Sequence, residues 1–209
     1  MQISKTNSMK KFILVLLTVL VSVCISAETK QHMKFMGIPM GITITNFQSK
    51  LVDKGVKYDN TSKQLPSGNR LFSGSFAGHK ANIFVYYDPS TKLVYRVKAC
   101  VEREDKPALD QVFFDYISMF IEKFGEESVA TPRTSQDNDK RQSHLKGYLT
   151  RGIELYYSGV FTEAGRIDIY EVVNDPDYII HLNDVYTLHI DYFDEVAEDI
   201  NHQNRLDDL

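Results

Sequence analysis

The sequence predicts an α+β fold in which antiparallel strands form one or more sheets packed by two main helices. Three observations lead to it. Apolar residues recur at helical spacing from 109 to 124, whereas residues 79–102 and 153–173 alternate between apolar and polar side chains. Long helical stripes beside alternating strands are typical of helices that lie on an antiparallel sheet with one buried face.

The first helix is expected shortly after residue 43. Residues 34–40 read as a short strand that Gly37 and Pro39 restrict to an edge or a bulge. Thr43 or Thr45 can cap the helix that follows, and Gly55 provides its stop. The helix carries three apolar residues at helical spacing, Ile44, Phe47 and Leu51. A polar linker, 59–69, separates it from the strands.

The first hairpin is predicted around a five-residue loop, 88–92. Pairing Tyr87 with Leu93 places the apolar residues of both strands on one face. The opposite face then carries Tyr86, Arg96 and Lys98, with Cys100 beside them. Clean sorting of this kind is expected of a sheet with one buried face.

The second helix has a cap, a proline in its first turn and a glycine stop. Asp105 is the predicted cap, Pro107 lies in the first turn, and Gly125 ends the helix. Its apolar stripe consists of Leu109, Val112, Phe113, Tyr116, Ile117, Phe120 and Phe124. We interpret this stripe as core that packs on a sheet, not as a cofactor slot.

Residues 126–147 are polar and read as a solvated excursion, and a second hairpin follows with 162–166 as its loop. This register places Leu155, Tyr157 and Phe161 with Ile167 and Ile169 on an apolar face. The other face carries two tyrosines, Tyr156 and Tyr170.

Residues 178–193 alternate but exceed a normal strand, so we expect a break near Asn183–Asp184. An acidic helix is predicted from Asp194 to the end of the chain. The order of helix, strands, helix, strands suggests two similar halves, with possible lobes at 28–104 and 105–209.

Residues 1–27 read as a secretory signal peptide. Lys5, Lys10 and Lys11 form a positive segment without acids, residues 12–25 are almost entirely apolar, and small residues precede a cut after Ala27. The apolar run is shorter than the roughly 20 residues that a membrane span requires. The expected location is therefore periplasmic or secreted. Lipidation at Cys24 is the alternative to cleavage near Ala27.

The negative net charge of the chain argues against some classes of binding partner. Removal of three lysines with the signal changes the formal net charge from −4 to −7, and no basic cluster remains. Nucleic acids and anionic membrane surfaces both require clustered Lys and Arg, so neither is an expected partner. Residues 28–209 suit a single mature domain without a stable membrane span. Cys100 is the one cysteine left in it, so no internal disulfide is expected.

No motif in the sequence indicates an enzyme, a metal or a cofactor. It contains no His-Glu-x-x-His, Gly-x-Ser-x-Gly, P-loop or Cys-x-x-Cys. His181 and His189 fall on opposite faces of the predicted strands, and residues 174–177 read as an Asx/Pro turn rather than a calcium loop. Lys98, Glu102 and Arg96 surround Cys100, but no histidine is placed as its base. We expect a structural thiol there.

Several short motifs together resemble a group of uncharacterised exported proteins from gut Bacteroidetes-type bacteria. The motifs are Phe35-Met36-Gly37-Ile38-Pro39, Lys54-Gly55, Phe76-Ala77-Gly78, Glu122-Lys123-Phe124-Gly125 and the closing Asp207-Asp208-Leu209. The resemblance implies export and carries no activity. The order of helix then sheet is also similar to periplasmic inhibitor or binding folds related to β-lactamase-inhibitor protein.

These observations predict an exported binding module that recognises a peptide, a protein or a component of the cell envelope. Its candidate binding residues lie on the polar faces of the two hairpins: Tyr86, Arg96, Lys98, Tyr156 and Tyr170. Tyrosine and arginine are enriched at interfaces. Two alternatives remain open: a periplasmic hydrolase whose carboxylates assemble only in the fold, and a subunit of an envelope assembly.

Overall fold

We analysed a computed structural model of the chain, which describes residues 31–134, 155–173 and 185–207. The described helices are α2 (Ile44–Asp53), α3 (Lys106–Phe124) and α4 (Glu195–Asp207), with short 3₁₀ segments η1 (Asn60–Gln64) and η2 (Glu126–Ser128). The small strands are β1 (Lys34–Phe35), β2 (Ile38–Pro39), β3 (Lys57–Tyr58) and β7 (Arg133–Thr134). The long strands are β4 (Asn69–Phe76), β5 (His79–Tyr87), β6 (Val94–Arg103), β8 (Tyr156–Thr162), β9 (Gly165–Val173) and β10 (Tyr186–Asp194).

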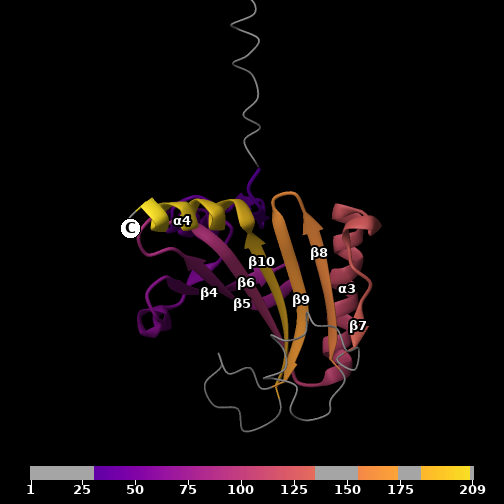
Figure 1. Ribbon diagram of the computed structural model, residues 1–209. Helices are drawn as coiled ribbons and strands as arrows, with labels where there is room; N and C mark the ends of the chain where they lie inside the picture. The colour runs from indigo at the N-terminus through magenta and orange to yellow at the C-terminus, as the bar shows by residue number, and fades with distance from the viewer. Residues whose placement is uncertain (1–30, 135–154, 174–184, 208–209) are drawn as a thin grey trace, which may run out of the picture. The chain divides into compact units, whose positions relative to one another are not determined.

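The long strands belong to one antiparallel sheet with the order β3-β4-β5-β6-β10-β9-β8-β7 (Figure 1). β1 and β2 pair separately as a small hairpin. The fold is therefore α+β with antiparallel sheets, as predicted. Each half of the chain runs from a helix through four strands of the large sheet, and the last strands of the halves, β6 and β10, pair at its centre.

The two main helices begin and end as the sequence predicts. Thr43 occupies the N-cap position of α2 as predicted, but its side chain makes no capping hydrogen bond. The buried residues of α2 are Ile44, Phe47 and Leu51. The carboxylate of Asp105 accepts a hydrogen bond from the Ala108 amide at 2.7 Å and caps α3. Gly125 ends α3 with φ of 85°, a conformation that favours glycine. Local signals of this kind act within one turn, so they are readable from sequence.

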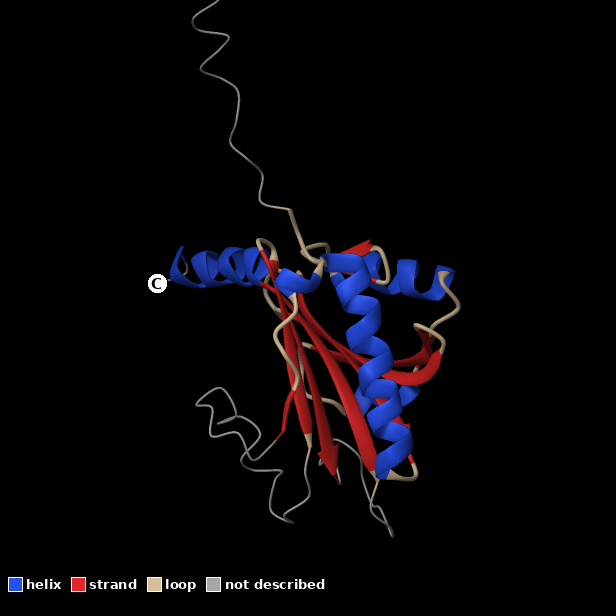
Figure 2. Cartoon of the chain, turned by 90° about the vertical axis from the view of Figure 1, so that its right-hand side faces the viewer, coloured by secondary structure: helices blue, strands red, loops and turns tan. Residues whose placement is uncertain are grey.

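α3 packs along one face of the sheet, with contacts to β6, β8 and β10 (Figure 2). We call this side the helix face. Its core joins Phe113 and Phe120 from α3 to Ile83, Ile169 and Ile190 from three strands. Phe124, predicted to be buried, is only partly so. Burial of this amphipathic stripe is what holds the helix on the sheet.

We call the opposite side the polar face. Its side chains come from five neighbouring strands: Phe84 and Tyr86, then Arg96, Lys98 and Cys100, then His189, Asp191 and Phe193, then Arg166, Asp168 and Tyr170, then Tyr157 and Phe161. Among the described elements, no helix runs along these strands on this side. α4 crosses one end of the sheet (Figure 1).

Asp194 joins the start of the described chain to the end of the sheet. Its carboxylate accepts hydrogen bonds from the amides of Ala197, at 2.8 Å, and Met33, at 3.1 Å. His32 lies 3.0 Å from the same carboxylate. Burial raises the pKa of Asp194, although these contacts act to lower it. The residue thus caps α4 and anchors the segment before β1.

The first hairpin keeps the predicted faces although its pairing is shifted. Val85 lies opposite Val97, and the ladder shifts between Tyr86 and Tyr87 at an irregularity. The observed pairing differs from the predicted one by two residues, and an even shift returns every side chain to the same face. Tyr86, Arg96 and Lys98 therefore share the polar face.

The second hairpin differs from the prediction. Thr162 pairs with Gly165, so the loop is Glu163–Ala164 and not the five residues 162–166. Gly165 is the first residue of β9, where a Cβ would lie 2.0 Å from the Phe193 carbonyl oxygen on β10. Its glycine therefore serves a close approach of two backbones rather than a turn.

Phe161 pairs with Arg166, whereas the predicted loop would pair it with Ile167. The pairing is thus shifted by one residue, and a shift by an odd number exchanges the two faces of β8. Tyr157 now lies opposite Tyr170 on the polar face, while Tyr156 points to the helix face and stacks on Phe113 with ring centroids 5.3 Å apart. The prediction that Tyr156 is a binding residue on the polar face is therefore wrong, because Tyr157 occupies that face instead.

Smaller expectations have mixed outcomes. Residues 34–40 form two short strands around a tight turn rather than one strand. The linker 59–69 contains η1, and the excursion 126–147 contains η2 and β7 in its described part. His181, residues 174–177, the break at Asn183–Asp184 and the proposed signal peptide lie outside the described residues. No described helix is long and apolar enough to cross a membrane.

Candidate functional site

Alternating aromatic and arginine side chains cross the polar face beside α4. Register places Tyr86, Arg96, Phe193, Arg166 and Phe161 opposite one another on five successive strands. We call these five residues the aromatic–arginine row. Phe161 is 44% exposed, and the other four are partly exposed.

The two guanidinium groups are stacked on the aromatic rings. The Arg96 Cζ lies 4.6 Å from the Tyr86 ring centroid and 4.9 Å from that of Phe193. The Arg166 Cζ lies 4.2 Å from the same Phe193 ring centroid. Cation–π contacts at these distances are favourable and fix the planes of the side chains. The row is therefore ordered before any partner arrives.

The buried carboxylate of Asp191 fixes the position of Arg96. Its Nε donates to Asp191 Oδ1 at 2.9 Å and its second guanidinium nitrogen to Oδ2 at 2.5 Å. Burial lowers the pKa of Arg96, but the hydrogen bonds and charge of Asp191 outweigh it and raise the pKa overall. Asp191 is only 1% exposed. The pair thus presents a flat guanidinium rather than a free positive charge.

The hydrolase alternative requires two available carboxylates, and Asp168 and Asp191 do lie opposite each other on β9 and β10. Both are already engaged. Asp191 accepts from Arg96, while Asp168 accepts from Arg166 and from the Tyr157 hydroxyl, each at 3.3 Å. Burial raises the pKa of Asp168 despite Arg166. These contacts indicate that the two carboxylates hold the arginines of the aromatic–arginine row in position.

The next positions on the same strands are more deeply buried. Cys100 lies opposite His189, and the exposed fractions of Cys100, His189 and Lys98 are 1%, 3% and 4%. The Lys98 ammonium lies 5.1 Å from the Phe84 ring centroid. Lys98 is therefore covered, contrary to its expected role at the surface. The sequence placed no histidine near Cys100, because their proximity depends on the β6–β10 register.

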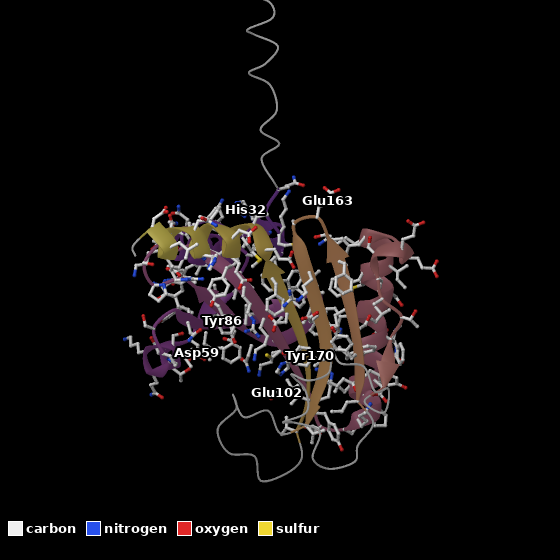
Figure 3. The ribbon with its side chains drawn as sticks, in the orientation of Figure 1. His32, Asp59, Tyr86, Glu102, Glu163 and Tyr170 are labelled. Atoms are coloured by element: carbon white, nitrogen blue, oxygen red, sulfur yellow. The ribbon has the colours of Figure 1, made fainter. Side chains whose placement is uncertain are left out.

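Tyr86 and Tyr170 lie on the side of the sheet away from α3, with Glu102 toward the other end of the strands (Figure 3). Tyr170 is half-buried, and its ring lies 4.9 Å from that of His189. Burial raises the pKa of Tyr170, so its hydroxyl remains a donor at neutral pH. A polar cavity of about 690 Å³ near Glu102 is lined by both acidic and basic residues, including Lys80 and Arg103.

Three residues of the row, Phe193, Arg166 and Phe161, were absent from the predicted set. Phe193 continues the alternation of Thr187, His189 and Asp191, so it carried a readable signal. Phe161 was assigned to the wrong face because of the hairpin register. Nothing local to a strand indicates that these residues meet.

Within the part of the chain that the structure describes, no group of three His, Cys, Asp or Glu side chains could hold a metal ion. Comparison with known protein families, with curated proteins and with solved structures finds no match to this chain. The class that fold and site support is an α+β protein with an ordered aromatic and arginine surface.

Proposed function

We propose that the protein is an exported, non-enzymatic binding module whose polar face receives a protein or peptide partner. The aromatic–arginine row carries this proposal. Tyr, Phe and Arg are the residue types enriched at protein interfaces, and those that dominate binding energy tend to be rigid and clustered.

The row suits association because its side chains are already immobilised. Binding normally costs about 0.5–1.5 kcal/mol for each flexible side chain that becomes ordered. Arg96 is held by Asp191 and two rings, and Arg166 by Phe193 and Asp168. A partner therefore meets flat surfaces that need little further ordering. The remaining guanidinium hydrogens favour carbonyl or carboxylate oxygens on that partner.

The test compares capture of envelope proteins by matched variants. Phe161→Asp places a charge at an exposed end of the row, whereas Phe114→Asp places the same charge at a residue of α3 that is 40% exposed. We expect a partner that is retained by the wild type and by Phe114→Asp but lost by Phe161→Asp. Its affinity, measured with purified components, should fall about tenfold or more for Phe161→Asp.

Equal retention by Phe161→Asp and the wild type would contradict the proposed surface. Equal loss by both variants would also contradict it, because the effect would not depend on the row. The location is tested separately by fractionation of the native host and N-terminal sequencing, which should give a mature chain that starts near Glu28.

A further inference from the structure

A second cavity, unrelated to the polar face, lies on the helix side of the sheet. Its volume is about 520 Å³, within the range of small-molecule sites, roughly 300–1,000 Å³. Aromatic side chains from β4, α3 and β10 line it: Phe76, Tyr116, Phe120 and Tyr192. Phe76 stacks on Tyr116 with centroids 5.6 Å apart, and Tyr192 meets Phe76 edge to face at 6.3 Å. The cavity thus has an ordered apolar floor.

Two turns contribute side chains at positions that normally favour other residues. Met36–Gly37 and Ala77–Gly78 are two-residue hairpin loops with positive φ at both positions. Such loops favour Asn, Asp or Gly at the first position. Met36 (φ 51°) and Ala77 (φ 46°) occupy it, and both line the cavity. Both residues thus adopt a backbone conformation that is unfavourable for a residue with a side chain, and such conformations cluster at ligand sites.

Lysines supply the only positive charges that line the cavity among the described residues. Lys54, at the end of α2, and Lys123, in the last turn of α3, are both exposed. Neither forms an ion pair with a described carboxylate. The Lys123 ammonium instead lies 4.9 Å from the Phe124 ring centroid. Two ammonium groups that pair with no described carboxylate, beside an apolar floor, are complementary to an amphiphilic anion.

Tyr192 adds a hydrogen-bond donor to the same wall. It is 3% exposed, and among the described residues its hydroxyl takes part in no hydrogen bond. The Tyr116 hydroxyl, by contrast, donates to the Phe76 carbonyl at 2.9 Å. Burial raises the pKa of Tyr192, so the hydroxyl keeps its proton and can donate to a ligand oxygen.

We propose that this cavity binds a small amphiphilic carboxylate. Its apolar body lies on the aromatic floor against Met36 and Met119, and its carboxylate lies beside Lys54 and Lys123. The proposal is independent of the polar face, because none of these residues belongs to the aromatic–arginine row.

The test uses octanoate, 1-octanol and octylammonium, which share a tail and differ in charge. Methyl-labelled methionine provides the readout by NMR. Met36 and Met119 line the cavity, whereas Met33 and Met40 are buried elsewhere and act as internal controls. We expect octanoate to shift the Met36 and Met119 signals saturably and to leave the two controls unchanged. Octanol should bind about tenfold more weakly, and octylammonium weaker still.

Variants separate the head group from the turn. The double substitution Lys54→Gln and Lys123→Gln should weaken octanoate about tenfold and leave octanol unchanged. Lys50→Gln, an exposed lysine of α2 outside the cavity, should change neither. Met36→Asn gives the turn a favoured residue and should weaken octanoate while the hairpin stays folded.

Absence of a saturable shift at Met36 and Met119 would overturn the proposal. So would equal affinity for octanoate and octanol together with no effect of the double lysine substitution, because the cavity would then not select an anion. Both outcomes leave the proposed function of the polar face unaffected.

Discussion

Arg96 shows how one side chain can serve both the fold and a surface. Its guanidinium lies between the rings of Tyr86 and Phe193 and donates twice to Asp191. The arginine neutralises a carboxylate that is almost fully buried, while its own side chain is 30% exposed. Removing it would deprive the buried carboxylate of Asp191 of both guanidinium hydrogen bonds.

Arg96→Ala should therefore lower the free energy of unfolding on the order of 3 kcal/mol. Arg166→Ala should cost less than about 1 kcal/mol, because one of its carboxylate partners is exposed and the other is partly exposed. Side chains of Asp168 and Glu195 are 20% and 56% exposed. Urea unfolding of both variants measures the difference. Equal losses would show that Asp191 does not depend on Arg96.

The buried carboxyl group of Glu171 leads us to expect that the stability of the protein depends on pH. It is 1% exposed on the helix face and accepts hydrogen bonds from the Tyr156 amide at 2.8 Å and from Lys106 at 3.0 Å. Its other oxygen, Oε1, is buried without a hydrogen bond. Burial raises the pKa of Glu171 from 4.5 to about 7, although the amide and Lys106 act against it.

A raised pKa means that the folded protein holds this proton more tightly than the unfolded chain. The resulting stability is fully present below pH 4.5 and is lost as the pH rises to about 7. We expect the melting temperature to fall by several degrees across this interval. Glu171→Gln should flatten the dependence. An unchanged slope in Glu171→Gln would assign it to other groups.

At the scale of elements, α3 is stabilised by its apolar stripe more than by its ends. Phe120 is 5% exposed and contacts Tyr116, Phe124 and Tyr192. Phe120→Ala should cost about 3–5 kcal/mol as a large-to-small core change. Phe114→Ala, at a residue 40% exposed, should cost about 1 kcal/mol or less. Thermal unfolding compares the two, and similar losses would contradict the packing of α3.

The β8–β9 hairpin depends on Gly165 for its approach to β10. A Cβ at this position would lie 2.0 Å from the Phe193 carbonyl oxygen, and backbone cannot move aside as a side chain can. Gly165→Ala should therefore destabilise the protein by about 3 kcal/mol or more.

Gly159→Ala is the matched control on the same hairpin. Its Cβ would meet the end of the Phe161 ring at 3.3 Å, which can shift, and the Ile167 carbonyl oxygen at 3.7 Å, an ordinary van der Waals distance. We expect a smaller loss of stability than for Gly165→Ala in the same chemical denaturation experiment. The reverse order would show that the β9–β10 approach is not as close as described.

At the scale of the whole molecule, the β6–β10 pairing makes one sheet of the two halves. Eight residue pairs join these strands, from Tyr186–Arg103 to Phe193–Arg96. Tyr192 also contacts Phe35 from the first half and Phe120 from the second. The core is therefore continuous across the boundary that the sequence suggests between residues 104 and 105.

We expect the two halves to unfold together. The slowest-exchanging amides of β5 and β9 should report the same free energy of opening in native-state hydrogen exchange. Phe120→Ala should lower both by the same amount, since a shared core transmits the loss. Two distinct free energies would indicate halves that unfold independently.

The sequence alone was sufficient for the features that neighbouring residues encode. The cap Asp105, the stop Gly125 and the buried residues of α2 and α3 follow from signals within one or two helical turns. The faces of β5 and β6 were also correct, because alternation reports a face even when the pairing is shifted by two residues.

Only the tertiary structure decided what depends on contacts between distant segments. The two-residue loop Glu163–Ala164 places Tyr157 instead of Tyr156 on the polar face, and it brings Gly165 to the position where β9 approaches the backbone of β10. The aromatic–arginine row, the Cys100–His189 neighbourhood and the aromatic cavity each combine elements far apart in the chain. Periodicity assigns a residue to a face, but the choice of neighbour across strands is made by packing of the whole sheet.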